Sequence, residues 1–241
     1  MTVIAEKVIV VFLADATLPA GDALDAVAAR GCCGSLVLPP GAAAHLENLL
    51  GVHRSDNGSA TLKFPKMPTA FFSAAESARA LAKALGIADV HDAQADTAEP
   101  AARALLATGG KQLVVVHETV GGVANWTRAL VSDLLSADDA HTLVAVVKAS
   151  NEALPTPAEP NAFRPRQSFE KVDGAYASGA ETAAPRRLLL AFYQKDRTRC
   201  DGAQRLEEAQ VDTLGSYGAM SALMFAQEVA FRLGFAPKYG A

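Results

Sequence analysis

The sequence has few of the residues from which cross-links and metal sites are commonly built. Its 241 residues include three cysteines and five histidines, and only 6% are aromatic. Two of the thiols are adjacent, at Cys32 and Cys33, so the spacing matches neither a disulfide framework nor a zinc site. Charged residues make up 20% of the chain and the net charge is −4, which gives no general attraction to nucleic acid or to an anionic membrane. We expect neither as a partner.

Long apolar runs are also missing. The first apolar run, residues 8–14, is too short to span a bilayer. Charged residues come before it, in an order that fits neither a signal peptide nor a transit peptide. We therefore expect a cytoplasmic or other intracellular protein without a secretion signal.

Hydrophobic residues are abundant, at 50% of the chain, and they fall in short runs that alternate with helical stretches. This alternation predicts a three-layer α/β fold with a mostly parallel central sheet. Runs of three or more consecutive apolar residues are typical of strands covered on both faces. Strands are predicted at residues 8–13, 35–38, 112–117, 143–148 and 188–193, and helices at 20–30, 43–50, 74–85, 100–107, 123–135 and 216–233.

Three segments interrupt this alternation. Asn57-Gly58 between extended stretches predicts a hairpin over residues 54–64. Residues 87–99 are polar and predict a surface loop or an irregular crossover. A Pro-rich stretch of about 150–185 predicts an irregular insertion into one domain that spans residues 1–241. The apolar residues of the C-terminal segment 228–241 predict a helix and tail that pack on the domain.

Two polar residues follow predicted strands directly and are the first candidates for a site. Asp15 comes after the first strand, and His117 ends the third. Ligands and metals commonly bind at the carboxyl ends of strands in an α/β sheet, although an Asp in this position also serves as a turn or helix cap. The chain contains no phosphate-binding loop, no dinucleotide fingerprint and no Gly-x-Ser-x-Gly elbow.

A second candidate is the alternation of Lys195, Arg197 and Arg199 after the last predicted strand. In an extended segment these side chains would point to one face and could bind a phosphate or a carboxylate. The simpler interpretation, which we favour, is ion pairing with acidic residues nearby in the sequence. The adjacent thiols Cys32 and Cys33 are expected to be buried as small apolar side chains, because they follow the C-terminal end of a helix and not its thiolate-stabilising N-terminus.

Several segments together resemble cofactor-independent phosphoglycerate mutases of the alkaline phosphatase superfamily. The N-terminal match is Lys7-Val-Ile-Val-Val-Phe-Leu-Ala-Asp-Ala-Thr-Leu18 with the following helix and Gly-containing strand. Arg164-Pro-Arg-Gln-Ser-Phe169, Asp173-Gly174, Thr198-Arg-Cys-Asp201 and residues 228–241 are similar to an uncharacterised plant and algal group of mutase relatives. The resemblance implies an alkaline phosphatase-like fold, here reduced in size.

The chemistry of that superfamily implies two divalent metals held by Asp and His residues, and a phosphorylated Ser or Thr. Asp15 matches the first metal aspartate, but Ala16 replaces the usual Gly, and Ala42-Ala-Ala44 stands where the nucleophile would be sought. There is no Asp-His pair and no Asp-x-x-x-His, which leaves His117 as the one proposed residual ligand. Our main hypothesis is therefore a non-catalytic domain that takes part in structure or interaction, with a protein partner and no cofactor.

Two alternatives remain open. In the first, a metal-dependent phosphotransferase or phosphomutase uses Asp15 and His117 with Mn, Mg or Zn, Thr17 as nucleophile, and further ligands from Asp92 and Asp138 or Asp139. In the second, the domain binds a phosphorylated small molecule through Lys195, Arg197 and Arg199.

Overall fold

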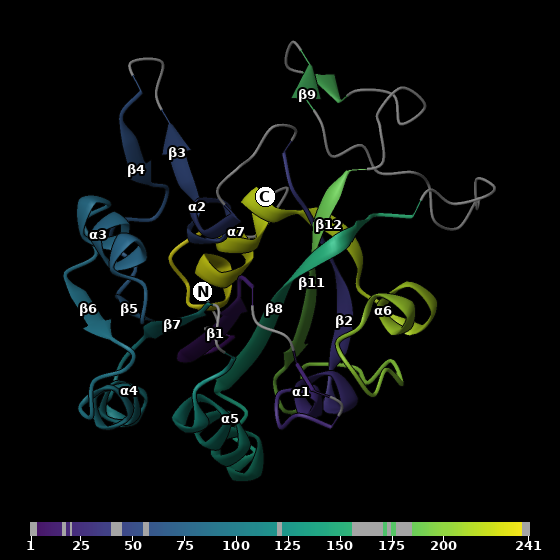
Figure 1. Ribbon diagram of the computed structural model, residues 1–241, viewed down its shortest axis with the longest axis horizontal. Coiled ribbons are helices and arrows are strands. Elements are labelled where there is room, and N and C mark those ends of the chain that lie inside the picture. The colour runs from purple at the N-terminus through teal and green to yellow at the C-terminus, as the bar shows by residue number, and fades with distance from the viewer. Residues whose placement is uncertain are drawn as a thin grey trace.

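An eight-stranded sheet forms the centre of the computed structural model, with helices on both faces (Figure 1). The structure describes residues 4–15, 18–19, 21–39, 45–54, 58–119, 122–155, 171–172, 175–176 and 185–237. The strands of the sheet are β1 (Lys7–Leu13), β2 (Cys32–Val37), β5 (Thr69–Ser73), β6 (Asp89–Asp92), β7 (Gln112–Glu118), β8 (Thr142–Ala153), β11 (Arg186–Tyr193) and β12 (Gly218–Ser221).

The strands follow the order β12-β2-β11-β8-β1-β7-β5-β6. Only β11 is antiparallel to its neighbours, β2 and β8; every other neighbouring pair is parallel. The carboxyl ends of the seven parallel strands therefore lie at one edge of the sheet, which we call the carboxyl edge. This arrangement confirms the predicted α/β class with a mostly parallel sheet.

The helices divide between the two faces of the sheet. On one face lie α2 (His45–Leu50), α3 (Glu76–Ala84) and α7 (Ala222–Arg232), and on the other α1 (Asp25–Arg30), α4 (Ala98–Ala107), α5 (Asn125–Ala137) and α6 (Glu208–Leu214). Each set buries its apolar side chains in a core cluster of its own. The result is the predicted three-layer arrangement.

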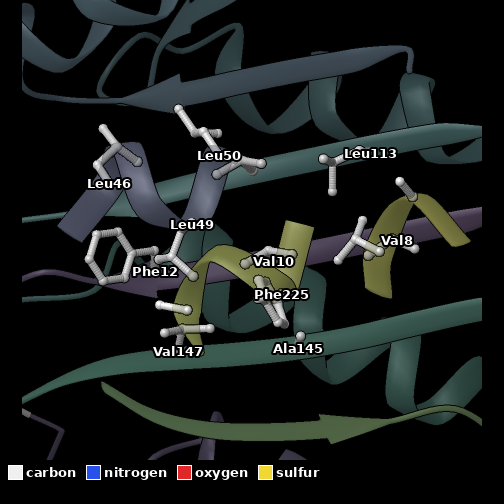
Figure 2. Packing of buried hydrophobic residues seen from close by; sticks show 14 of the residues in the cluster. Val8, Val10, Phe12, Leu46, Leu49, Leu50, Leu113, Ala145, Val147 and Phe225 are labelled. Carbon is white, nitrogen blue, oxygen red and sulfur yellow. The ribbon is translucent and has the colours of Figure 1, made fainter. Parts of the chain in front are cut away.

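Central strand β1 shows why the predicted apolar runs are uninterrupted. Val8, Val10 and Phe12 pack into one core cluster, while the residues between them pack into the other. In Figure 2, Leu49 of α2 and Phe225 of α7 lie over this strand. Complete burial of such a side chain contributes about 1.5–3 kcal/mol of transfer free energy, so both faces of β1 must be apolar.

The prediction of a loop over residues 87–99 is wrong. Residues 89–92 form β6, which pairs in parallel with β5 at the end of the sheet, and α4 begins at Ala98. The ring of His91 stacks on that of Phe72, with centroids 4.5 Å apart. Pairing with β5 and this aromatic contact outweigh the polar composition of the segment.

The helix predicted over residues 216–233 is also corrected. Its first part forms β12, beside β2, and the helix α7 begins at Ala222. Gly218 has φ +75°, which interrupts a helix, and a Cβ at Gly34 would lie 2.6 Å from the carbonyl oxygen of Gly218. Close approach of the two strands therefore depends on glycine at position 34.

The remaining predictions differ in outcome. The hairpin is confirmed, because β3 (Val52–Arg54) and β4 (Ala60–Leu62) pair antiparallel. Most of the Pro-rich segment, about 150–185, lies outside the described residues; β8 extends to Ala153, and the short strands β9 (Lys171–Val172) and β10 (Ala175–Tyr176) pair with each other. No helix in the described ranges is both long and apolar enough to cross a membrane.

The C-terminal segment is packed on the domain as far as it is described. Leu233 and Ala236 are buried, and the carbonyl oxygen of Arg232 accepts hydrogen bonds from the backbone amides of Ile4 and Ala5 at 3.2 and 3.0 Å. The two ends of the described chain are thus joined by hydrogen bonds. Tyr239, part of the predicted tail, lies outside the described residues.

Candidate functional site

The carboxyl edge brings together polar side chains from three adjacent strands. Asp15 lies two residues beyond the end of β1 and is exposed. Phe12 in β1 is paired with His117 in β7, which is in turn paired with Ser73 in β5. The two residues that the sequence predicted as metal ligands, Asp15 and His117, therefore lie at the same edge.

His117 is held in a fixed position by its surroundings. Its side chain is buried, its ring stacks against Phe12 and Phe71 at centroid distances of 5.5 and 6.1 Å, and its Nδ1 lies 2.9 Å from Oγ of Ser73. Burial lowers the pKa of His117, and the negative charge of Asp15 partly opposes this shift. The ring is therefore neutral at pH 7, with Nδ1 engaged.

Glu118, the next residue, contributes to structure and not to an open site. Its Oε1 accepts hydrogen bonds from Oγ1 of Thr127 at 2.6 Å and from the backbone amide of Ala124 at 3.2 Å. Both donors belong to the beginning of α5, whose first amides have no partner within the helix. This buried carboxylate thus fixes α5 to the end of β7.

A second histidine belongs to the same neighbourhood, although no pattern in the sequence pointed to it. His45 begins α2, and its Nε2 lies 3.0 Å from Nη2 of Arg186, which can only donate. Burial, followed by the positive charge of Arg186, lowers the pKa of His45, whereas the carboxylate of Asp15 raises it. Asp15 thus acts electrostatically on two neutral imidazoles.

This group of side chains does not form a two-metal centre. Within the described parts of the chain, no three His, Cys, Asp or Glu side chains are grouped so that they could hold a metal ion. A two-metal site needs several ligands around two ions that lie only about 4 Å apart. The donors found here fall short of that requirement. Thr17, the predicted nucleophile, lies outside the described residues.

The other proposed ligands are dispersed. Asp92 lies at the carboxyl end of β6, three strands away from β1, and pairs with Arg79 at 3.3 Å. Asp138 and Asp139 lie between α5 and the beginning of β8, at the opposite edge of the sheet from Asp15. The hypothesis that Asp138 or Asp139 completes a site with Asp15 is therefore wrong, because strand direction separates them.

The basic residues after β11 also lie at that opposite edge, and the segment is not extended. The carbonyl oxygen of Gln194 accepts from the amides of Arg197 and Thr198, which makes a turn, and Asp196 has φ +59°. Lys195 pairs with Asp138 at 3.0 Å, while Arg197 and Arg199 are exposed. The three side chains would share one face only in an extended segment, and that condition is not met, since the backbone turns.

Asp138 is the centre of an ion-pair cluster there. Its carboxylate accepts from Arg30 at 2.8 Å and from the hydroxyl of Tyr193 at 2.6 Å, as well as from Lys195. Hydrogen bonds from Tyr193 and Lys195 lower the pKa of Asp138. Lys195 is thus ion-paired, but its partner is Asp138 and not one of the acidic residues nearby in the sequence that the simpler interpretation named.

The cysteines follow the prediction of burial. Cys32 and Cys33 are buried, and desolvation raises the pKa of Cys33 to about 12. Cys200 is exposed, and its Sγ donates to the carbonyl oxygen of Ala29 at 3.2 Å. The buried pair consists of protonated apolar thiols, which are poor nucleophiles.

Comparison with known proteins identifies the fold. No protein-family model and no curated protein sequence matches the chain. Among solved structures, it is similar to the PH0037 protein from Pyrococcus horikoshii, with a TM-score of 0.61 and 10% identity over 100% of both chains. It is also similar to the alkaline phosphatase of the Antarctic bacterium TAB5, with a TM-score of 0.50 and 8% identity over 95% of this chain and 98% of that one.

A cofactor-independent phosphoglycerate mutase from Thermoplasma acidophilum is matched at a TM-score of 0.40 and 14% identity. The match covers 70% of this chain and 37% of the mutase, so the chain spans little more than a third of that protein. At this TM-score the mutase adds no argument about the fold. At such low identity the other two likenesses show the fold alone, and the TAB5 structure identifies that fold as alkaline phosphatase-like.

Proposed function

We propose that this chain is a reduced alkaline phosphatase-like domain that acts through a protein partner and not through catalysis. The observation that carries the proposal is the small donor set at the carboxyl edge. The negative charge of one exposed residue, Asp15, acts on two imidazoles. Nδ1 of His117 lies within hydrogen-bond distance of Ser73, and Nε2 of His45 lies within hydrogen-bond distance of Arg186. In the described residues no larger group of ligands surrounds them.

Phosphoryl transfer of the two-metal type sets requirements that the described side chains at this edge do not meet. The metals must be held in fixed positions, because they activate the nucleophile and neutralise charge on the transferred group. Glu118, the buried acid nearest to His117 in sequence, holds the beginning of α5. A domain with this donor set retains the scaffold of the fold, and scaffolds of this kind are reused for many functions.

The runner-up is a metal-dependent phosphotransferase or phosphomutase. It is favoured by the likeness to an alkaline phosphatase and by the action of Asp15 on both His117 and His45. If Nδ1 of His117 carries its proton and donates to Ser73, its Nε2 is free to bind a metal. Mn, Mg or Zn would be the ion. Under this runner-up proposal, the chain would be related by descent to the plant and algal group of mutase relatives.

Binding of a phosphorylated small molecule without turnover is the third candidate. Arg197 and Arg199 are exposed and available to an anion, although Lys195 already pairs with Asp138. Stabilisation by phosphate esters in a thermal-shift assay, lost in the double variant Arg197→Ala with Arg199→Ala, would support it.

The main proposal is tested by loading the purified full chain with Mn, Mg or Zn and measuring bound metal and activity together. Hydrolysis of p-nitrophenyl phosphate and interconversion of phosphoglycerates are the two activities. We expect neither to exceed that of the variant Asp15→Ala. The matched control is Asp96→Ala, which removes an exposed aspartate that follows β6, three strands away from β1. Activity that depends on Asp15 but not on Asp96 would replace this proposal by the runner-up.

A further inference from the structure

A hollow in the surface lies between the segment that joins β4 to β5 and the chain that follows α7. The residues that line it are Lys63, Phe64, Pro65, Lys66, Met67 and Phe235. Its lining ends just before Thr69, where β5 begins. The hollow therefore lies at the edge where the parallel strands begin, opposite the carboxyl edge with Asp15 and His117.

The size of the hollow favours a single large side chain as its occupant. Its volume is about 270 Å³. Pockets for small molecules usually measure about 300–1,000 Å³ and enclose most of the ligand, whereas a cavity of about 150 Å³ already holds benzene. Pro65 and Lys66 are exposed, so the hollow is open to solvent. An aromatic side chain of another protein fits these dimensions better than a whole cofactor does.

Three ammonium groups surround the apolar lining. Nζ of Lys63 lies 5.7 Å from the ring centroid of Phe64, and Nζ of Lys111 lies 5.3 Å from that of Phe235. Lys63 donates to the neutral amide oxygen of Gln227 at 2.6 Å. Among the described residues, no carboxylate forms an ion pair with Lys63, Lys66 or Lys111. The positive charges around the hollow are therefore not neutralised.

The sequence around the hollow contains no acidic residue. Residues 58–70, 108–112 and 229–237 include neither Asp nor Glu. The acidic residues just outside these segments act elsewhere, because Glu228 pairs with Arg232 at 2.7 Å and the charge of Glu6 acts on Lys7. The hollow is thus a locally positive site on a chain whose net charge is −4. Such a site selects an acidic partner that the chain as a whole does not attract.

We propose that this hollow binds an acidic segment of a protein partner, with an aromatic side chain in the hollow and carboxylates at the three lysines. The inference rests on the proposed function, because it states the chemistry of the partner of a domain that acts through binding. An aromatic anchor in a pocket with charged groups at the rim is the usual arrangement of a protein interface. A membrane surface fits less well, since Phe64 and Phe235 are half-buried and line a hollow, while membrane binding requires an apolar face that enters the lipid.

The test uses a synthetic peptide in which two glutamates stand on each side of one phenylalanine. Its binding to the purified full chain is measured by fluorescence anisotropy of an attached dye. Lys66→Glu should weaken binding by about fivefold or more, because repulsion replaces attraction at one carboxylate. Lys66 is exposed, so this variant should fold, which circular dichroism checks.

The matched control is Lys83→Glu, which makes the same change in net charge. Lys83 is exposed in α3 and does not line the hollow. At physiological salt the Debye length is about 8 Å, so the control should change affinity by less than about twofold. Peptides with serine in place of phenylalanine, or with glutamine in place of the glutamates, should bind at least about fivefold more weakly than the original.

Four results would overturn the inference. They are no binding of the original peptide, equal weakening in Lys66→Glu and Lys83→Glu, undiminished binding of the serine peptide, and binding to phosphatidylserine vesicles that depends on Lys66. None of them bears on the proposed absence of catalysis, which is decided separately by metal content and turnover.

Discussion

The Oγ atom of Ser73 lies 2.9 Å from Nδ1 of His117, and both side chains are buried where β5 and β7 end. Ser73 Oγ also accepts from the backbone amide of Ala75 at 3.1 Å. The serine thus joins the imidazole to the chain that leads into α3. This contact holds the one histidine that the sequence singled out, whether or not the ring ever binds a metal.

Removing that hydroxyl should destabilise the protein. Ser73→Ala leaves Nδ1 of His117 buried without this partner, and we expect a loss of about 1–3 kcal/mol in the free energy of unfolding. Urea titration measures it. The control Ser136→Ala removes an exposed hydroxyl bonded within its own helix and should change stability by no more than about 0.5 kcal/mol. Equal effects in the two variants would contradict the structural role of Ser73.

Stability should fall when the pH drops below the ordinary pKa of histidine. Burial lowers the pKa of His117 from 6.5, so the unfolded chain takes up a proton before the folded one does. The neutral ring of His117 makes its full contribution to the free energy of unfolding above pH 6.5. As the pH falls from there towards the pKa of His117 in the folded protein, this contribution decreases by up to about 1.4 kcal/mol per pH unit. Denaturation curves at a series of pH values, compared with His117→Gln, should show a shallower dependence in the variant. An unchanged dependence would be evidence against this assignment.

The ion pair of Arg187 and Asp212 should be costly to break. The guanidinium of Arg187 is fully buried and holds the Asp212 carboxylate through both Nη atoms, one of them at 2.9 Å. Asp212→Asn removes the nearer countercharge and leaves only Glu152, at 4.0 Å, and we expect a loss of about 3 kcal/mol in the free energy of unfolding. In the double variant Arg187→Met with Asp212→Leu, no charge remains buried, so it should be more stable than the single variant. The reverse order of stability would refute this explanation.

Thiol modification should distinguish the cysteines by burial. Cys200 is exposed, whereas Cys32 and Cys33 are buried and the pKa of Cys33 is raised to about 12. A chromogenic disulfide reagent should modify one thiol rapidly and the other two only after unfolding. Cys200→Ser should remove the rapid phase. Rapid loss of all three thiols in the folded wild type would show that the burial described here is wrong.

Much of the fold could be predicted because burial on both faces leaves a clear mark in the sequence. The apolar run of β1 was recognisable for that reason. β6 was not, because its position depends on pairing with β5 and on stacking of His91 against Phe72. β12 was taken for the start of a helix, since the contact between Gly34 and Gly218 joins residues far apart in the chain.

The candidate site was predictable to the same extent. Asp15 and His117 follow or end parallel strands, so their common edge followed from the topology. His45 could not be found in this way, because its contact with Arg186 spans 141 residues. The direction of β8 likewise places Asp138 at the other edge, which no spacing along the sequence indicated.

The central claim is our proposal that the chain does not carry out two-metal phosphoryl transfer, which rests on the small donor set among the described residues of the carboxyl edge. Its most direct test is elemental analysis of the purified full chain after loading with Mn, Mg or Zn and removal of loosely bound ions, for the wild type and for Asp15→Ala. We predict less than one tightly bound metal per chain, with no difference between the two proteins. Two metals per wild-type chain, lost in Asp15→Ala, would contradict the claim.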